Sequence, residues 1–247
     1  MFWSSFALGS VVTAVAARVY ARHIKRIRNA DWVTPNMLGK RRIRGIVTSV
    51  ADGDGFRLYH TPAIGWRFPL NFRNLPQRVK GGETLYIRLA GVDAPEMSSF
   101  GKPEQPFAKE AQLWLSDKIL GKHVVCELLS KDQYRRVIAN AYVSSNSFLP
   151  LFKTNLAHRL LSDGYGTVYE QHGAQYGSWG KELYQKLEAD AKEDRRGMWK
   201  NGPDIETPAQ YKRRHAQGNV DDASASSDED TAVPESKTWI RRLLSKT

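Results

Sequence analysis

The sequence predicts an α+β fold, mostly β, built on a five-stranded OB-fold barrel that carries three helices. Five short segments alternate apolar and polar residues with the period of two that a strand requires. One segment with helical spacing lies between the third and the fourth of them, and two more follow the fifth. The order β-β-β-α-β-β-α-α is typical of a small Greek-key barrel of the OB type. We expect this domain at 43–202, after an N-terminal transmembrane helix and before a disordered tail.

The first 21 residues are expected to form a transmembrane or signal-anchor helix. Met1 to Ala17 carries no charged side chain, and only Arg18 interrupts the run to Ala21. About 20 apolar residues span a bilayer. Basic residues follow at 22–28, and the positive-inside rule keeps such residues in the cytosol or its topological equivalent. The sequence therefore predicts a single-pass membrane protein whose main domain lies on that side.

Two other interpretations of the segment stay open. A cleaved secretory signal is disfavoured because the charges follow the apolar run, where a signal peptide carries them before it. A mitochondrial presequence fits the abundance of arginine and the lack of any acid before Asp31. Because an anchor is compatible with mitochondrial import, we expect a mitochondrial membrane, with another intracellular membrane as the alternative.

The formal charge of +11 is concentrated near the N-terminus, where residues 1–44 carry nine basic side chains against Asp31 alone. Residues 22–42 are expected to be a basic linker. The remaining core is mildly positive, which permits a polyanionic substrate without requiring one. The single cysteine, Cys126, excludes an internal disulfide framework.

The elements of the barrel follow in order. Strands at 44–50 and 56–59 flank an Asp-Gly turn, which is a hairpin signal. A third strand at 85–92 ends in the turn 93–96. A helix at 107–120 places four apolar residues on one face and stops at a glycine. The remaining elements are strands at 122–129 and 136–144 and helices at 154–163 and 180–196, each helix being followed by a glycine.

Two stretches fall outside this pattern. The segment 60–82 mixes aromatic with basic residues, which suits either a hairpin extension that packs on the domain or a clamp for single-stranded nucleic acid. Packing is favoured, because aromatic side chains are mostly core residues. The tail 203–247 is expected to be disordered, since it is rich in serine and acidic residues from 217 to 236.

Three separated segments carry residues suited to phosphate chemistry. They are the acidic turn at 52–54, the strand and turn from Arg88 to Glu96, and the segment 131–136. Arginine matches phosphate oxygens with a planar fork of donors, and carboxylates suit a hard metal ion or a general base. Each segment alone is weak evidence for a functional site, since Asp-Gly turns and an arginine on a strand are ordinary surface features.

Together and in order, the segments resemble the landmarks of staphylococcal nuclease-like domains. The landmarks are DGDGF, IRLAGVDAPE, FGKPEQPFAKEA, KDQYRR, LLSDGYGTVY and EADAKEDRRGMW. The resemblance runs from Ile43 to Trp199 and implies a five-stranded OB barrel and a Ca²⁺-dependent endonuclease that acts on DNA, RNA or both. The apolar N-terminus and the long loop before Arg88 further resemble the fungal membrane-anchored endonucleases of this superfamily, which are assigned to mitochondria.

The resemblance also implies roles for single residues. It assigns catalysis to Arg88, Glu96 and Arg136, with Glu96 orienting or activating the attacking water. It assigns Ca²⁺ binding to the carboxylates of Asp54 and Asp93 and to the backbone carbonyl of Ala94. It assigns substrate contacts to Tyr134 and Tyr169.

Two positions depart from the family pattern. Gly55 stands where the family usually has threonine or a similar polar residue, so a hydroxyl near the metal is missing. Arg135 stands where the family has glycine, so it must adopt a backbone angle that favours glycine or alter the turn before Arg136. An active nuclease is the leading hypothesis; a nucleic-acid-binding module with a weakened site, and a membrane adaptor that uses the domain as a scaffold, are the alternatives.

Overall fold

The computed structural model describes residues 2–67, 69–98, 101–144 and 153–215. The chain divides into two units, Met1–Pro208 and Ala209–Thr247. In the second unit, residues 209–215 are helical, so the prediction of disorder is wrong for them. The part of the predicted disordered tail from 216 to 247 lies outside the described residues.

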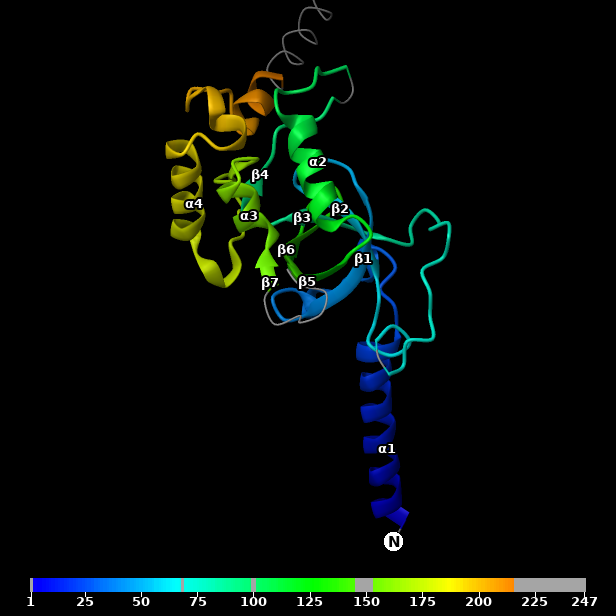
Figure 1. Cartoon of the computed structure of the whole chain (residues 1–247). Coiled ribbons are helices and arrows are strands. Elements are labelled where there is room, and N and C mark those ends of the chain that lie inside the picture. Colours follow the sequence, from blue (N-terminus) through cyan, green and yellow to red (C-terminus); the bar gives the residue numbers. More distant parts are fainter. Residues whose placement is uncertain (1, 68, 99–100, 145–152, 216–247) are drawn as a thin grey trace, which may run out of the picture. The chain divides into compact units, whose positions relative to one another are not determined.

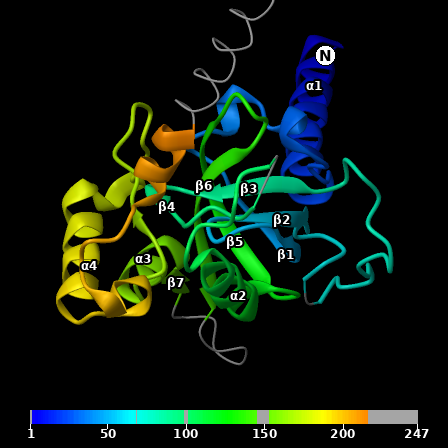
Figure 2. The same ribbon diagram turned by 90° about the horizontal axis from the view of Figure 1, so that it is seen from above.

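Five strands of the first unit close into a barrel (Figures 1 and 2). They are β1 (Arg42–Val50), β2 (Gly55–His60), β3 (Leu85–Leu89), β5 (His123–Lys131) and β6 (Val137–Ser144). The sheet runs β3-β2-β1-β5-β6, and its neighbours are antiparallel. A parallel pairing of β3 with β6, with Ile87 opposite Val137, joins the two outer strands. This pairing closes the sheet and confirms the predicted barrel.

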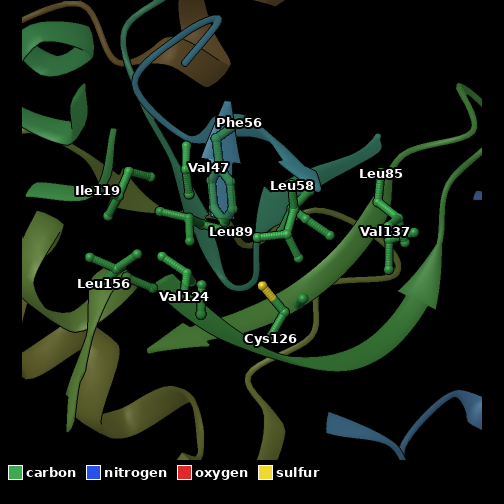
Figure 3. Close-up of a cluster of buried hydrophobic side chains, with 14 of the residues drawn as sticks. Val47, Phe56, Leu58, Leu85, Leu89, Ile119, Val124, Cys126, Val137 and Leu156 are labelled. Atoms are coloured by element: carbon green, nitrogen blue, oxygen red, sulfur yellow. The ribbon is translucent and has the colours of Figure 1, made fainter. Parts of the chain in front are cut away.

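The barrel encloses the inward side chains of its strands (Figure 3). Buried residues alternate with more exposed ones along β1 and β5, as the period-two pattern predicts. Each large apolar side chain that is fully buried contributes roughly 1.5–3 kcal/mol. The labelled core residues are Val47, Phe56, Leu58, Leu85, Leu89, Ile119, Val124, Cys126, Val137 and Leu156, all no more than 1% exposed.

Three helices pack outside the barrel, as predicted. They are α2 (Ala108–Ile119), α3 (Leu156–Ser162) and α4 (Lys181–Glu193). The buried residues of α2 are the four apolar positions that the sequence places on one face. Helix α3 is preceded by a short strand, β7 (Lys153–Asn155), and the Asn155 side chain caps it by accepting from two backbone N–H groups.

The predicted strand 85–92 is two elements. β3 ends at Leu89, a turn follows at 90–91, and β4 (Val92–Asp93) pairs with β8 (Thr167–Val168). Gly91 turns the chain with φ +73°, a conformation that side chains disfavour. The turn directs Asp93 away from the line of β3 and back toward the end of the barrel.

The N-terminal helix α1 spans Phe2–Val19 and continues as a short π-helical turn, Tyr20–Ile24. Among the helices in the described ranges, none is long and apolar enough to cross a membrane. The transmembrane helix predicted at 1–21 is therefore not supported. Helix α1 has 18 residues, and serines, glycine, threonine and Arg18 interrupt its apolar sequence.

Residues 22–42 are not the free linker that their charge predicts. Ile27, Ala30 and Val33 are buried and belong to the barrel's core cluster. The Lys131 ammonium donates to the carbonyls of Ala30 and Val33 at 3.4 and 2.9 Å. The Ile27 N–H donates to His60 Nδ1 at 2.9 Å. Ile27, Ala30 and Val33 are apolar and spaced three residues apart, and this spacing was the sequence signal for burial amid the many basic residues.

Neutral His60 is required to accept the hydrogen bond from Ile27, so we expect a pH-dependent stability. Burial and the charges of Arg41 and Arg26 lower the pKa of His60 from 6.5 to about 3. Between these values the unfolded chain binds a proton that the folded chain does not. Stability therefore falls as the pH drops through that window, by roughly 1.4 kcal/mol per pH unit.

Urea unfolding of wild type and His60→Asn across the same pH range measures this contribution. Asparagine offers an acceptor but does not titrate, so the stability difference between the two proteins should shrink as the pH falls. A difference that stays constant with pH would contradict a neutral, buried imidazole.

Candidate active site

Strand pairing brings the three predicted segments to one end of the barrel. In the β2–β3 ladder, Gly55 lies opposite Arg88, which places the acidic turn at 52–54 beside Arg88. In the β3–β6 ladder, Ile87 lies opposite Val137, which places Arg136 beside the same strand on its other side. Strand β3 is therefore flanked by the acidic turn on one side and by the second arginine on the other.

Arg88 is held between two carboxylates. Its Nε donates to Asp54 Oδ2 at 3.0 Å and its Nη2 to Asp93 Oδ1 at 2.7 Å. All three residues are at most 8% exposed. Burial alone would lower the pKa of Arg88, but the charges of Asp54 and Asp93 outweigh it and raise that pKa. The guanidinium also lies over the ring of Tyr169, 4.8 Å from its centroid. The predicted residues Asp54, Arg88, Asp93 and Tyr169 thus form one cluster.

Asp52 adds a further carboxylate to this cluster. It accepts a hydrogen bond from the Tyr86 hydroxyl at 2.9 Å. Burial and the neighbouring Asp54 carboxylate raise the pKa of Asp52 to about 7, and Glu96 contributes in the same direction. Within the described part of the chain, the buried Oδ1 of Asp52 has no hydrogen-bond partner. The site therefore holds more negative charge than its own donors satisfy.

Two glycines let the acidic turn approach its neighbours. A Cβ on Gly53 would stand 2.6 Å from the Cβ of Ala94 and 2.8 Å from that of Ala111. A Cβ on Gly55 would stand 2.4 Å from Asp52 Oδ1 and 2.8 Å from the Tyr86 hydroxyl oxygen. The pair of Asp52 and Tyr86 therefore occupies the space where a larger residue at position 55 would place its side chain.

Gly55→Ala is expected to lower the free energy of unfolding by about 1–3 kcal/mol, because the added methyl displaces Asp52 or Tyr86 from a packed site. Urea unfolding measures the change. Gly81→Ala is the matched control, since no heavy atom lies within 4 Å of a Cβ at that position. Equal stability of the two variants would contradict the tight packing at Gly55.

Arg136 is positioned by the turn that precedes β6. Its Nε donates to Asp132 Oδ2 at 2.6 Å, and its backbone N–H donates to Asp132 Oδ1 at 2.9 Å. Tyr134 lies under the guanidinium, with 5.3 Å between Arg136 Cζ and the ring centroid, and is 69% exposed. Arg135 adopts the left-handed conformation with φ +62°. The turn therefore has the backbone form that glycine would allow, and Arg136 still enters β6 at its expected place.

Glu96 lies on the extended segment after β4 and is half-buried. Its backbone N–H donates to Gln105 Oε1 at 3.1 Å, and the Gln105 amide in turn donates to the Glu206 carbonyl at 2.6 Å. Gln105 is only 2% exposed and ties the loop that carries Glu96 to the chain after α4. The Glu96 carboxylate is close enough to Asp52 to help raise its pKa.

The predicted metal ligands fit a hard cation by their chemistry. Across the described residues, no group of three or more His, Cys, Asp or Glu side chains is arranged to hold a metal ion. The predicted set is smaller, with two carboxylates and the carbonyl of buried Ala94. The carboxylates of Asp52, Asp54, Asp93 and Glu96 gather near Arg88, and carboxylate oxygens are the ligands that a hard divalent cation takes.

Sequence reasoning missed three residues that shape the site. Asp132 carried a signal, because it lies four residues before Arg136 in a segment already singled out. Gln105 and Tyr86 carried none, since a glutamine in a loop and a tyrosine on a strand are unremarkable until their partners across the fold are known.

The sequence of the chain is similar to a known protein family and to several fungal proteins. Residues 86–201 match the family model described as "Staphylococcal nuclease homologue". The chain is 47% identical over 248 aligned residues to the "Probable endonuclease LCL3" of Schizophyllum commune, covering 98% of this chain and 84% of that protein. Proteins with the same name from Debaryomyces hansenii and Candida albicans are 41% and 42% identical, covering 86% and 85% of their lengths.

Proposed function

The chain belongs to the family of staphylococcal nuclease homologues, and on that premise we propose that it is a Ca²⁺-dependent endonuclease that hydrolyses phosphodiester bonds of DNA, RNA or both. The observation that carries the proposal is the meeting of two arginines with an excess of carboxylates at one end of the barrel. The relatives that match over most of their length are named as probable endonucleases, which supports the same class of reaction.

The two arginines have the chemistry to stabilise the phosphate. In phosphodiester hydrolysis, negative charge builds up on the non-bridging oxygens in the transition state. Arg88 lies on β3 and Arg136 directly precedes the neighbouring strand β6, and each has its side chain fixed by a carboxylate. Fixed guanidinium groups need little reorganisation when the charge develops, which favours the transition state over the bound substrate.

Glu96 is the proposed general base. It is half-buried and close enough to the cluster to help raise the pKa of Asp52. A carboxylate in this place can orient a water and take its proton as the water attacks phosphorus. Proton transfer of this kind contributes typically about 10²–10⁴-fold to the rate.

Asp54, Asp93 and the carbonyl of Ala94 are the proposed Ca²⁺ ligands. Ca²⁺ held there would neutralise charge on the carboxylates and on the substrate phosphate. The buried Asp52 oxygen that lacks a partner in the described structure supports an added cation. Tyr134 and Tyr169 are the proposed substrate contacts, since each lies against one of the two catalytic arginines.

The location of the protein is a separate proposal. We propose that it resides at a mitochondrial membrane, because its N-terminal segment is apolar, then rich in arginine, and free of acids before Asp31. Cell fractionation of the full chain tests this. Recovery in a fraction without mitochondria would refute it.

A cleavage assay tests the proposed activity. The full chain is incubated with single-stranded DNA, duplex DNA and RNA, in Ca²⁺ and in chelator. We expect cleavage that requires Ca²⁺ and begins within the strand. Folded protein that binds nucleic acid but cleaves none of the three substrates would refute the proposal and favour a binding module with a weakened site.

A further inference from the structure

A basic and aromatic pocket of about 570 Å³ lies outside the catalytic cluster. It forms between the segment that follows α1 and the loop that joins β2 to β3, which lie side by side in Figures 1 and 2. The Ile64 N–H donates to the His23 carbonyl at 2.9 Å and joins the two walls. The lining residues that matter here are Lys25, Arg26, Arg28, Trp32, Trp66 and Arg73.

The pocket is suited to an anion. Four of its lining residues are basic, and none of the residues that line it in the described structure is acidic. Glu83, outside the lining, pairs with Arg26 and approaches Arg28 at 3.7 Å. One carboxylate therefore pairs with two of the four cations.

The pocket also offers an aromatic face. Trp32 is 39% exposed, with Lys25 and Arg28 at 4.8 and 5.6 Å from its ring centroid. Trp66, by contrast, packs against Tyr59 at 5.7 Å between centroids. The packing of Trp66 agrees with the favoured interpretation of the loop 60–82. Trp66 packs on the domain as expected, while Arg73 from the same loop contributes to the basic pocket.

An ion pair connects this pocket to the catalytic turn, which is the turn at 132–135 directly before Arg136. Arg135 donates from Nε to Asp31 Oδ1 at 3.2 Å, and its Nη2 pairs with the other carboxylate oxygen. Asp31 is followed by Trp32, and Arg135 lies between Tyr134 and Arg136. Two exposed aromatic rings, each with an arginine over it, thus flank one ion pair. A strand whose phosphate lies at Arg136 would reach the pocket within a few nucleotides.

We propose that this pocket is a subsite for single-stranded nucleic acid, in which a base stacks on Trp32 and Lys25, Arg28 and Arg73 hold the backbone phosphates. The inference rests on the proposed function and extends it by naming the substrate form. Proteins that bind single-stranded nucleic acid without sequence preference combine aromatic rings, on which the bases stack, with basic groups that bind the backbone. An anionic lipid headgroup would use the charges alone and would not explain the tie to the catalytic turn.

Binding in chelator tests the inference without cleavage. A fluorescent single-stranded oligonucleotide is titrated with the full-length protein, and anisotropy reports the Kd. We expect Trp32→Ala to weaken binding roughly fivefold to a hundredfold, as the loss of one stacked base does. Lys25→Glu should weaken binding and lower its dependence on salt concentration. Both side chains are exposed, so neither change should affect folding.

Matched controls separate the pocket from general effects. Trp179→Ala removes a comparably exposed tryptophan, and Lys186→Glu reverses an exposed charge on α4; both should bind as wild type does.

The outcomes are distinct for the two proposals. Wild type that binds the oligonucleotide through Trp32 but cleaves nothing supports the subsite and refutes the proposed activity. Cleavage together with unchanged binding by both pocket variants refutes the subsite alone. Variants that lose binding to phosphatidylserine vesicles and retain oligonucleotide binding would also refute it, in favour of a lipid site.

Discussion

Replacing Arg88 with methionine is expected to lower the free energy of unfolding by about 3–5 kcal/mol, the cost of leaving buried charge without its partner. Arg88 is 8% exposed and is the cation between Asp54 and Asp93, which are buried with it. Methionine has a similar length and no charge, so the two carboxylates would face each other across a site poor in solvent. The same change should abolish cleavage, because it removes a fixed guanidinium from the proposed phosphate site.

Urea unfolding of Arg88→Met, with and without Ca²⁺, measures the effect. A cation that binds the folded state alone stabilises it. Ca²⁺ should therefore stabilise the variant more than the wild type, since it restores positive charge near Asp54 and Asp93. Arg42→Met is the matched control: its partner is Glu127, but the Arg42 side chain is 64% exposed, and such surface pairs are worth about 0–1 kcal/mol. Equal destabilisation by the two changes would contradict a buried charge cluster.

Glu96→Gln is expected to lower the rate of cleavage by about 10²–10⁴-fold, because the amide cannot accept the proton of the attacking water. The change keeps the size of the side chain and leaves the backbone hydrogen bond to Gln105 in place. Stability should change by less than about 0.5 kcal/mol, as for most substitutions on a partly exposed surface.

Single-turnover cleavage of one oligonucleotide, with circular dichroism as the check on folding, measures the loss. Glu104→Gln makes the same chemical change at an exposed position in the neighbouring segment and should leave the rate unaltered. Full activity of a folded Glu96→Gln protein would remove Glu96 from the mechanism. Asp52, whose pKa is raised to about 7 by burial and by Asp54, would then be the next candidate for the base.

Residues 22–42 belong to the folded domain, which therefore begins before the predicted boundary at residue 43. Ile27, Ala30 and Val33 bury their side chains in the core cluster, so a protein trimmed at residue 43 would expose apolar core surface. The same segment carries Trp32 and Asp31 to the catalytic turn. Its basic side chains are therefore part of the folded unit, and they contribute to the positive pocket beside the barrel.

The sequence by itself predicted the barrel and a candidate site for phosphate chemistry. Period-two alternation and the glycine stops indicated five strands and three helices, and the resemblance to staphylococcal nuclease-like domains implied how they close into a barrel. Motif order indicated Arg88, Glu96 and Arg136 with the carboxylates of Asp54 and Asp93. These signals are local or family-specific, so they can be read from the sequence without knowing which residues are in contact.

Only the tertiary structure decided which side chains meet across the fold. The partners Asp52 and Tyr86 are 34 residues apart, and Asp31 and Arg135 are 104 apart. The structure explains the two departures from the family motif. Gly55 makes room for the hydrogen-bonded pair of Asp52 and Tyr86. Arg135 adopts a left-handed backbone conformation and binds Asp31 of the N-terminal segment. A contact between distant residues depends on strand register and chain closure, and no local pattern of residues encodes it.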